Sequence, residues 1–230
     1  MKYVFTLILF ILFFHVIQAQ NLEVFGGSLK NTVKICSNDT PWEESHQSSY
    51  EGYSIGIGIN NLVPDSFPKL RFRITARYDE YGNYIYAYSG GRWGYSKDEV
   101  IVQKRNISLG IYPVNFKVVK DLEIGIGIEL GVLLNSKTVG YRNTYYNNGN
   151  PQTPSVSTSK NYEIENNSIH YKKIIPGLVG RASYKIPLSS HFRLIPQAEY
   201  YHGLLKEYQD LVLETHSRRW SIKLGLEYKI

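Results

Sequence analysis

The chain ends on Trp220-Ser-Ile-Lys-Leu-Gly-Leu-Glu-Tyr-Lys-Ile230, a stretch in which every second residue is apolar. The polar or small residues in between are Ser221, Lys223, Gly225, Glu227 and Lys229. A period of two predicts a β-strand with one apolar face. A soluble protein could bury that face in a core. A strand that crosses a membrane carries the same alternation, because one face meets lipid and the other faces a polar interior.

Seven further segments show the alternation and decide how many strands the chain can form. They are Leu22–Leu29, Tyr53–Asn60, Leu70–Tyr78, Ile107–Tyr112, Leu122–Leu134, Ile174–Tyr184 and Phe192–Tyr201. The pattern is most regular from Leu122 to Leu134 and weakest in the first segment. With the final strand, the sequence predicts eight strands.

The connections between these strands come in two lengths that alternate strictly along the chain. The short ones contain proline and are Asn60–Pro68, Pro113–Asp121 and Ile186–His191. The long, polar ones are Lys30–Ser49, Asp79–Lys104, Asn135–Ser168 and Leu204–Ser217. A Greek-key sandwich has no reason to keep this order. The order predicts an all-β fold: an eight-stranded antiparallel up-and-down transmembrane β-barrel with short periplasmic turns and long extracellular loops.

Two of the long connections are rich in tyrosine. In the first, alternating tyrosines lead to Gly90-Gly91, which predicts a tight hairpin turn and a ribbon that continues beyond the membrane. The connection Asn135–Ser168 is polar and predicts a mobile loop. Tyrosine and tryptophan offer amphipathic contact area, so these loops are the candidate surface for a partner. The predicted contact residues are Tyr84, Tyr86, Trp93, Tyr141, Tyr145 and Tyr146.

The amino terminus predicts export. Lys2 precedes an apolar run from Val4 to Phe14, and Ile17 and Ala19 fit the −3 and −1 positions of a cleavage site. Residues 1–19 are therefore predicted to be a signal peptide and residues 20–230 the barrel domain. The alternative is a retained anchor helix, but the run is shorter than the roughly 20 residues that a span needs. A barrel exported in this way is expected in the outer membrane.

Charge and cysteine content exclude several classes of protein. The formal net charge is +6, but lysine and arginine are dispersed, which predicts no nucleic-acid partner. Basic residues at a membrane rim could instead meet anionic lipid headgroups. The single cysteine, Cys36, cannot form an internal disulfide.

The polar faces of the predicted strands carry charges of both signs. An eight-stranded barrel is only wide enough for its own side chains to fill. Inward-facing charges are therefore predicted to pair as a salt-bridged plug rather than to line an open pore or an ion path. The predicted lumen network comprises Arg71, Arg73, Arg77, Glu129, Arg181, Glu199, Lys223 and Glu227.

No motif predicts catalysis, a cofactor or a metal. His46-Gln-Ser48, Ser190-His191 and His216-Ser217 bring histidine near serine, but none has an evident acidic partner, so the chain is not expected to be an enzyme. The six histidines and one cysteine lack metal-ligand spacing. The Gly-x-Gly strings at Gly56 and Gly125 do not open a helix, as a nucleotide site would require.

The carboxy-terminal residues Lys223, Gly225, Tyr228 and Ile230 resemble the assembly signal of outer-membrane barrels, in which a polar residue, a glycine and terminal hydrophobic residues recur. Bacterial members usually end on phenylalanine rather than isoleucine. The whole chain resembles the small outer-membrane β-barrels of Gram-negative bacteria, including PorT-like barrels and the outer-membrane protein A and X types. That resemblance implies contact with outer-membrane lipid and lipopolysaccharide, and with the barrel-assembly machinery.

Three functions fit these observations. The first is an integral outer-membrane barrel with a structural, adhesive or partner-docking role, in which surface loops meet a protein or glycan partner. The second is a component of an export or assembly machine in the outer membrane. The third is an exported soluble lipocalin-like barrel, whose apolar residues would face a ligand in the lumen.

Overall fold

The computed structural model describes residues 21–36, 43–62, 72–91, 94–146, 155–165, 172–207 and 214–230. The predicted signal peptide lies outside these residues, as do Arg71 and Trp93. Among the described residues, no helix is long and apolar enough to cross a membrane.

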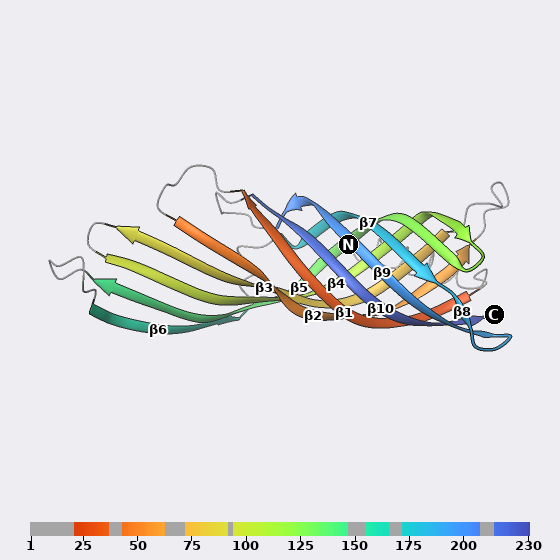
Figure 1. Ribbon diagram of the computed structural model, residues 1–230, viewed down its shortest axis with the longest axis horizontal. Helices are drawn as coiled ribbons and strands as arrows, with labels where there is room; N and C mark the ends of the chain where they lie inside the picture. Colours follow the sequence, from red (N-terminus) through yellow and green to blue (C-terminus); the bar gives the residue numbers. More distant parts are fainter. Residues whose placement is uncertain are drawn as a thin grey trace, which may run out of the picture.

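Eight strands form one closed antiparallel sheet, which confirms the predicted fold (Figure 1). They are β1 (Asn21–Cys36), β2 (Glu43–Leu62), β3 (Phe72–Gly91), β4 (Gly94–Val119), β5 (Leu122–Tyr146), β7 (Ile174–Tyr184), β9 (Phe192–Lys206) and β10 (Glu214–Lys229). Each strand pairs with the next one in this order, and β10 closes the sheet against β1. Two further strands lie outside this ring: β6 (Ser155–Glu165) pairs with β5, and the two-residue β8 (Ile186–Pro187) pairs with β9.

The alternation that predicted β10 sorts its side chains between two environments. Ile222 and Leu224 point outward and are 73% and 54% exposed, whereas Lys223 and Glu227 point inward and are 2% and 0% exposed. The pattern is the reverse of a soluble protein, in which apolar side chains lie inside. A barrel that buries its charges and exposes its aliphatic side chains is suited to a lipid environment, where closure also pairs the backbone groups of the wall.

Aromatic side chains border the apolar outer face at both ends. Near one end, the rings of Tyr200 and Trp220 lie 4.4 Å apart, and near the other the rings of Phe192 and Tyr228 lie 5.2 Å apart. The rise of about 3.3 Å per residue puts Trp220 about 26 Å from Tyr228 along β10, or about 20 Å after strand tilt. This is close to the apolar band of roughly 25 Å that outer-membrane barrels carry between aromatic girdles.

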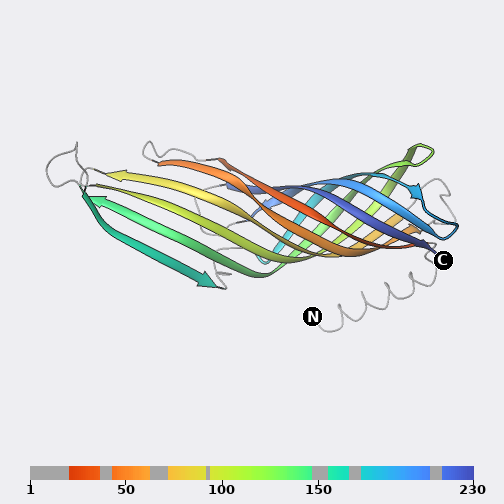
Figure 2. The same cartoon turned by 60° about the horizontal axis from the view of Figure 1, so that its bottom comes forward.

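Four wall strands continue beyond the barrel at the end opposite the carboxyl terminus (Figures 1 and 2). β1 pairs with β2 only as far as Lys30 opposite Glu51, and β7 pairs with β5 only as far as Ile174 opposite Val132. Beyond these points β2, β3, β4 and β5 stay paired with one another, and β6 extends the sheet along β5. We call this part, residues 43–50, 81–91, 94–104, 136–146 and 155–165, the surface sheet.

The surface sheet corrects the predicted loops. The prediction of a mobile loop over Asn135–Ser168 is wrong for its described parts, because residues 137–146 and 155–165 pair as antiparallel strands. The predicted ribbon after Asp79 is present. Its turn is displaced, however, because Gly90 and Gly91 pair with Tyr95 and Gly94 and so belong to the ladder.

Pro113 does not begin a turn as the sequence predicted. β4 runs through it to Val119, and the chain reverses at residues 120 and 121. The register between β4 and β5 shifts between Ile111 and Val114. Proline lacks an N–H donor, so a bulge is a place where a strand can hold it without losing a ladder bond.

Candidate functional site

The barrel interior is filled by charged side chains of both signs. Among the described residues, seven acidic and seven basic side chains are buried. The acids are Glu23, Asp79, Glu123, Glu129, Glu199, Glu207 and Glu227, and the bases are Arg73, Arg77, Lys104, Arg181, Lys185, Arg219 and Lys223. Each of these residues takes part in at least one ion pair with another. The interior is thus balanced in charge, as burial in a low-dielectric space requires.

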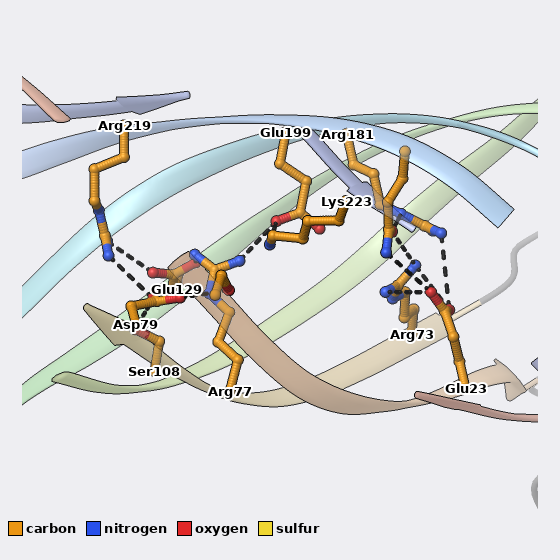
Figure 3. Close-up of polar contacts among 12 residues, drawn as sticks. Glu23, Arg73, Arg77, Asp79, Ser108, Glu129, Arg181, Glu199, Arg219 and Lys223 are labelled. Atoms are coloured by element: carbon orange, nitrogen blue, oxygen red, sulfur yellow. Dashed lines mark hydrogen bonds and ion pairs between the residues drawn. The ribbon is translucent and has the colours of Figure 1, made fainter. Parts of the chain in front are cut away.

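Arg77 lies at the centre of this interior and contacts three carboxylates (Figure 3). Its Nε lies 2.9 Å from Asp79 Oδ2, its Nη1 lies 2.6 Å from Glu199 Oε2, and its Nη2 bonds Glu129. The planar guanidinium presents five donors in a fixed fork, so it can join carboxylates from β3, β5 and β9 at once. Arg77 therefore ties together three strands of the wall.

Two other bases complete the balance of this central cluster. Arg219 on β10 donates to Asp79 Oδ2 at 3.2 Å and to Glu129 Oε1 at 2.8 Å, and Lys223 bonds Glu199. The Arg219 guanidinium also lies 3.6 Å from the ring centroid of Tyr201, a cation–π contact. Three acids and three bases from four strands therefore pair with one another inside the barrel at this level.

A second cluster lies toward the chain ends. Arg73 meets Glu23 through two parallel contacts, with Nη1 3.2 Å from Oε2 and Nη2 3.2 Å from Oε1. Arg181 donates from Nε to Gln197 Oε1 at 2.7 Å, and Gln197 donates to Glu23 Oε1 at 3.1 Å. Such bidentate pairs fix orientation as well as charge. Two stacked networks thus span the interior of the barrel.

The structure places most of the predicted lumen residues in these networks. Their side chains lie inside the barrel at Arg73, Arg77, Glu129, Arg181, Glu199, Lys223 and Glu227, whereas Arg71 lies outside the described residues. The sequence prediction omitted Glu23, Asp79, Lys104 and Arg219. Glu23 and Arg219 fall on the inward-facing positions of β1 and β10, so the alternation along these strands could have predicted them. Asp79 and Lys104 lie in a segment that was predicted to be a loop.

The four residues of the predicted assembly signal occupy different environments. Lys223 belongs to the lumen network, while Tyr228 and Ile230 are 43% and 67% exposed on the outside. Gly225 faces inward, and a Cβ there would lie 2.6 Å from Glu23 Oε1. Glycine therefore leaves room for the carboxylate that pairs with Arg73. The role of these residues in membrane insertion stays a prediction.

On the surface sheet, two predicted contact tyrosines meet one carboxylate. The hydroxyl of Tyr84 donates to Glu99 Oε2 at 2.9 Å, and Tyr141 donates to the same oxygen. Beside them, Lys97 Nζ lies 5.9 Å from the ring centroid of Tyr145. The backbones of Tyr86 and Tyr146 lie in β3 and β5, with Tyr86 directly opposite Glu99. Residues from three strands thus form a surface cluster, Tyr84, Lys97, Glu99, Tyr141 and Tyr145.

The surface cluster predicts how the pKa values of Glu99 and Tyr141 shift. Hydrogen bonding to Glu99 raises the pKa of Tyr141 to about 12, and the bonds from Tyr141 and Tyr84 lower the pKa of Glu99. The contact needs ionised Glu99 and protonated Tyr141, so it is lost when pH falls through the lowered carboxyl pKa or rises through about 12. Replacing Glu99 with glutamine should return the pKa of Tyr141 toward the ordinary value of 10.0.

Carbon-13 NMR of Cζ-labelled tyrosine measures this shift, with the resonance assigned by Tyr141→Phe. The control is Glu51→Gln, which removes an exposed glutamate on β2. An unchanged Tyr141 titration in Glu99→Gln would contradict the contact.

The histidine pairs give no catalytic arrangement within the described residues. Ser190 Oγ and His191 Nδ1 lie 2.8 Å apart on an exposed turn, and His216 Nδ1 contacts the carbonyl of Gly203. The side chain of His46 lies outside the described part of the chain. The described residues also contain no group of three or more potential metal ligands.

A closed eight-stranded sheet with an apolar outer face and an ion-paired interior defines a transmembrane β-barrel of the outer-membrane type. No family model and no curated protein matches the chain. Similar solved structures include Neisserial surface protein A, with 13% identity and a TM-score of 0.41 over 91% of this chain and 97% of that chain. Ail, the attachment invasion locus protein of Yersinia pestis, has 8% identity and a TM-score of 0.42 over 91% and 99%.

The outer membrane protease OmpT of Escherichia coli is also similar, with 8% identity and a TM-score of 0.35 over 91% of this chain and 96% of that chain. These likenesses concern the fold.

Proposed function

We propose that this protein is an integral outer-membrane barrel that docks a protein or glycan partner at the cell surface and neither conducts nor catalyses. The observation that carries the proposal is the surface sheet. Four strands leave the barrel still paired, so the tyrosines stand on a hydrogen-bonded sheet. A scaffold of this kind reduces the ordering cost of binding.

The chemistry of the surface cluster suits a polar partner. Tyr84, Tyr141 and Tyr145 provide rings with hydroxyl groups, and Glu99 and Lys97 add one charge of each sign. Tyrosine buries large area at low entropic cost and hydrogen-bonds at its edge. The cluster can therefore pack against a sugar ring or a peptide while its polar atoms fix the orientation.

The interior supports a role without transport. The central cluster ties β3, β5, β9 and β10 across the lumen, and the second cluster ties β1, β3, β7 and β9. Passage of a solute would require separation of buried ion pairs, and leaving one charge unpaired costs about 3–5 kcal/mol. Function at this barrel is therefore expected on its outside.

Removing the three ring side chains together should abolish docking. Cells that display Tyr84→Ser, Tyr141→Ser and Tyr145→Ser in one chain are expected to bind a glycan array or a panel of surface proteins at least about tenfold more weakly than the wild type, as loss of hot-spot residues does. The matched control is Thr138→Ala with Thr144→Ala, on the opposite face of β5. Undiminished binding by the tyrosine variant would refute this surface, and a wild type that binds none of the probes would refute docking.

A further inference from the structure

The last strand of the surface sheet is paired along one edge. β6 pairs with β5 from Glu165 opposite Lys137 to Ser155 opposite Tyr146, and among the described residues it pairs with no other strand. Figures 1 and 2 both draw it along the margin of the surface sheet. An unpaired edge presents a row of backbone N–H and C=O groups with which a further strand can pair. The edge of β6 is therefore a candidate binding surface for an extended peptide.

The regular part of this edge is long enough to hold a peptide. The register between β5 and β6 shifts between Thr144 and Tyr145, and the ladder is continuous from Thr158 to Glu165. Eight residues at about 3.3 Å each extend over about 26 Å. A strand that adds to a sheet edge takes its affinity from main-chain hydrogen bonds and its specificity from its side chains. The residues of β6 therefore decide which sequence the edge accepts.

One position of the edge favours an acidic partner residue. In the ladder, Asp98 of β4 lies opposite Arg142 of β5, and Arg142 lies opposite Lys160 of β6. This row thus places two bases in neighbouring strands beside one acid. Like charges directly opposite each other destabilise a pair of strands, whereas opposite charges stabilise it. An aspartate or glutamate opposite Lys160 on an added strand would balance the charge of the row.

A second position favours a basic partner residue. Glu163 lies opposite Val139, which lies opposite Ile101, so the neighbouring positions on β5 and β4 supply no base. By contrast, Glu165 lies opposite Lys137. A lysine or arginine on an added strand would pair with Glu163. Antiparallel pairing is slightly more stable per residue than parallel pairing. In the antiparallel direction the base comes three residues before the acid, so the accepted sequence reads basic-x-x-acidic.

The β6 strand of a second copy does not supply this sequence, although it reads Lys160-Asn-Tyr-Glu163. Residues directly opposite in an antiparallel pair share a face of the sheet, and successive residues alternate between the faces. With Lys160 of one copy opposite Glu163 of another, the second sheet would be turned over and would present the edge that its own β5 occupies. The opposite margin of the surface sheet, residues 43–50, contains no lysine or arginine. The partner is therefore a different protein.

We propose that the edge of β6 binds an extended segment of a partner protein, which adds to the surface sheet as an antiparallel strand and carries a base three residues before an acid. The inference rests on the membrane placement in the proposed function, because the surface sheet must stand outside the cell. It is separate from the surface cluster, because it uses main-chain groups of β6 and the charges of Lys160 and Glu163 rather than the tyrosines.

Two synthetic peptides of the same composition test the proposal on the purified barrel in detergent. Both consist of alternating threonine and valine, but one contains Lys-x-x-Glu and the other Glu-x-x-Lys. The first should bind about tenfold more tightly, because two attractive cross-strand pairs replace two repulsive ones. Hydrogen exchange shows where it binds. Every second amide from Thr158 to Glu165, those that face away from β5, should become protected.

The matched variant is Lys160→Glu with Glu163→Lys, which keeps the composition of β6 and reverses the order of its charges. It should prefer the Glu-x-x-Lys peptide by about the same factor. Failure of the wild type to bind the Lys-x-x-Glu peptide, equal binding of the two peptides, an unchanged preference in the variant, or binding without protection of β6 would each overturn the proposal.

The triple tyrosine variant separates this edge from the proposed function. It keeps β6, so it should bind the Lys-x-x-Glu peptide as the wild type does, while its docking on cells is lost. Loss of peptide binding in that variant would place the peptide on the surface cluster and would overturn the proposed edge site. Retained docking on cells would instead refute the surface cluster and leave the edge site standing.

Discussion

Replacing Arg77 with alanine is expected to lower the free energy of unfolding by about 3–5 kcal/mol, as removal of one partner from a buried ion-pair network does. Three carboxylates, Asp79, Glu129 and Glu199, would lose their shared partner. Arg219 and Lys223 still contact them, but two cations cannot balance three buried anions. The loss should therefore exceed that of any single surface pair.

Urea unfolding of the barrel in lipid vesicles, followed by tryptophan fluorescence, measures the loss. The control is Arg105→Ala, which removes an ion pair to Glu80 whose arginine side chain is 51% exposed. Exposed pairs contribute about 0–1 kcal/mol. If Arg77→Ala unfolded at the same urea concentration as this control, the central cluster would not stabilise the barrel.

The central cluster also predicts how the barrel behaves in a conductance measurement. With Arg77 in place, the wild type reconstituted in a planar bilayer is expected to show no large stable conductance. Such a conductance would contradict the closed interior and, with it, the absence of transport in the proposed function.

Much of the barrel wall was predictable because its environment imposes a pattern. Lipid on one side and a polar lumen on the other force the alternation, so the sequence predicted the outward face of β5 and β10 and the inward direction of Arg73 and Glu199. The pairing of those charges was not predictable. Whether Arg77 meets Glu129 or Glu227 depends on the stagger of strands around the barrel, which alternation does not encode.

Outside the predicted ribbon of β3 and β4, the strands of the surface sheet escaped prediction for the opposite reason. These strands face no lipid there, so they carry polar residues on both faces: Ser48 and Asn143 lie on one face, and Ser49 and Thr144 lie on the other. Such a composition cannot be distinguished from the composition of a loop. What reveals the strands is continuity: β5 keeps its pairing with β4 past Asn135 as far as Tyr146. Polar surface contacts were therefore predictable as residues but not as a sheet.

Placing an arginine at Ile128 should separate a membrane barrel from a soluble one. Ile128 lies midway along the barrel part of β5, points outward and is 57% exposed. At the midplane of a bilayer, arginine on the lipid face costs about 2–4 kcal/mol, falling to about 0–1 near the interface. We therefore expect Ile128→Arg to lower the free energy of unfolding in vesicles by about 2–4 kcal/mol.

Val118→Arg is the matched control for Ile128→Arg. Val118 is similarly exposed, at 56%, but lies beside the turn at residues 120 and 121, and there the cost should stay below about 1 kcal/mol. A lipocalin-like barrel would place Ile128 against water or a ligand and would give no such dependence on depth. The structure argues against that alternative, because the lumen that would hold an apolar ligand is filled by Arg77, Glu129 and their partners. If Ile128→Arg and Val118→Arg lowered the free energy of unfolding by the same amount, the outward aliphatic face would not be explained by contact with lipid.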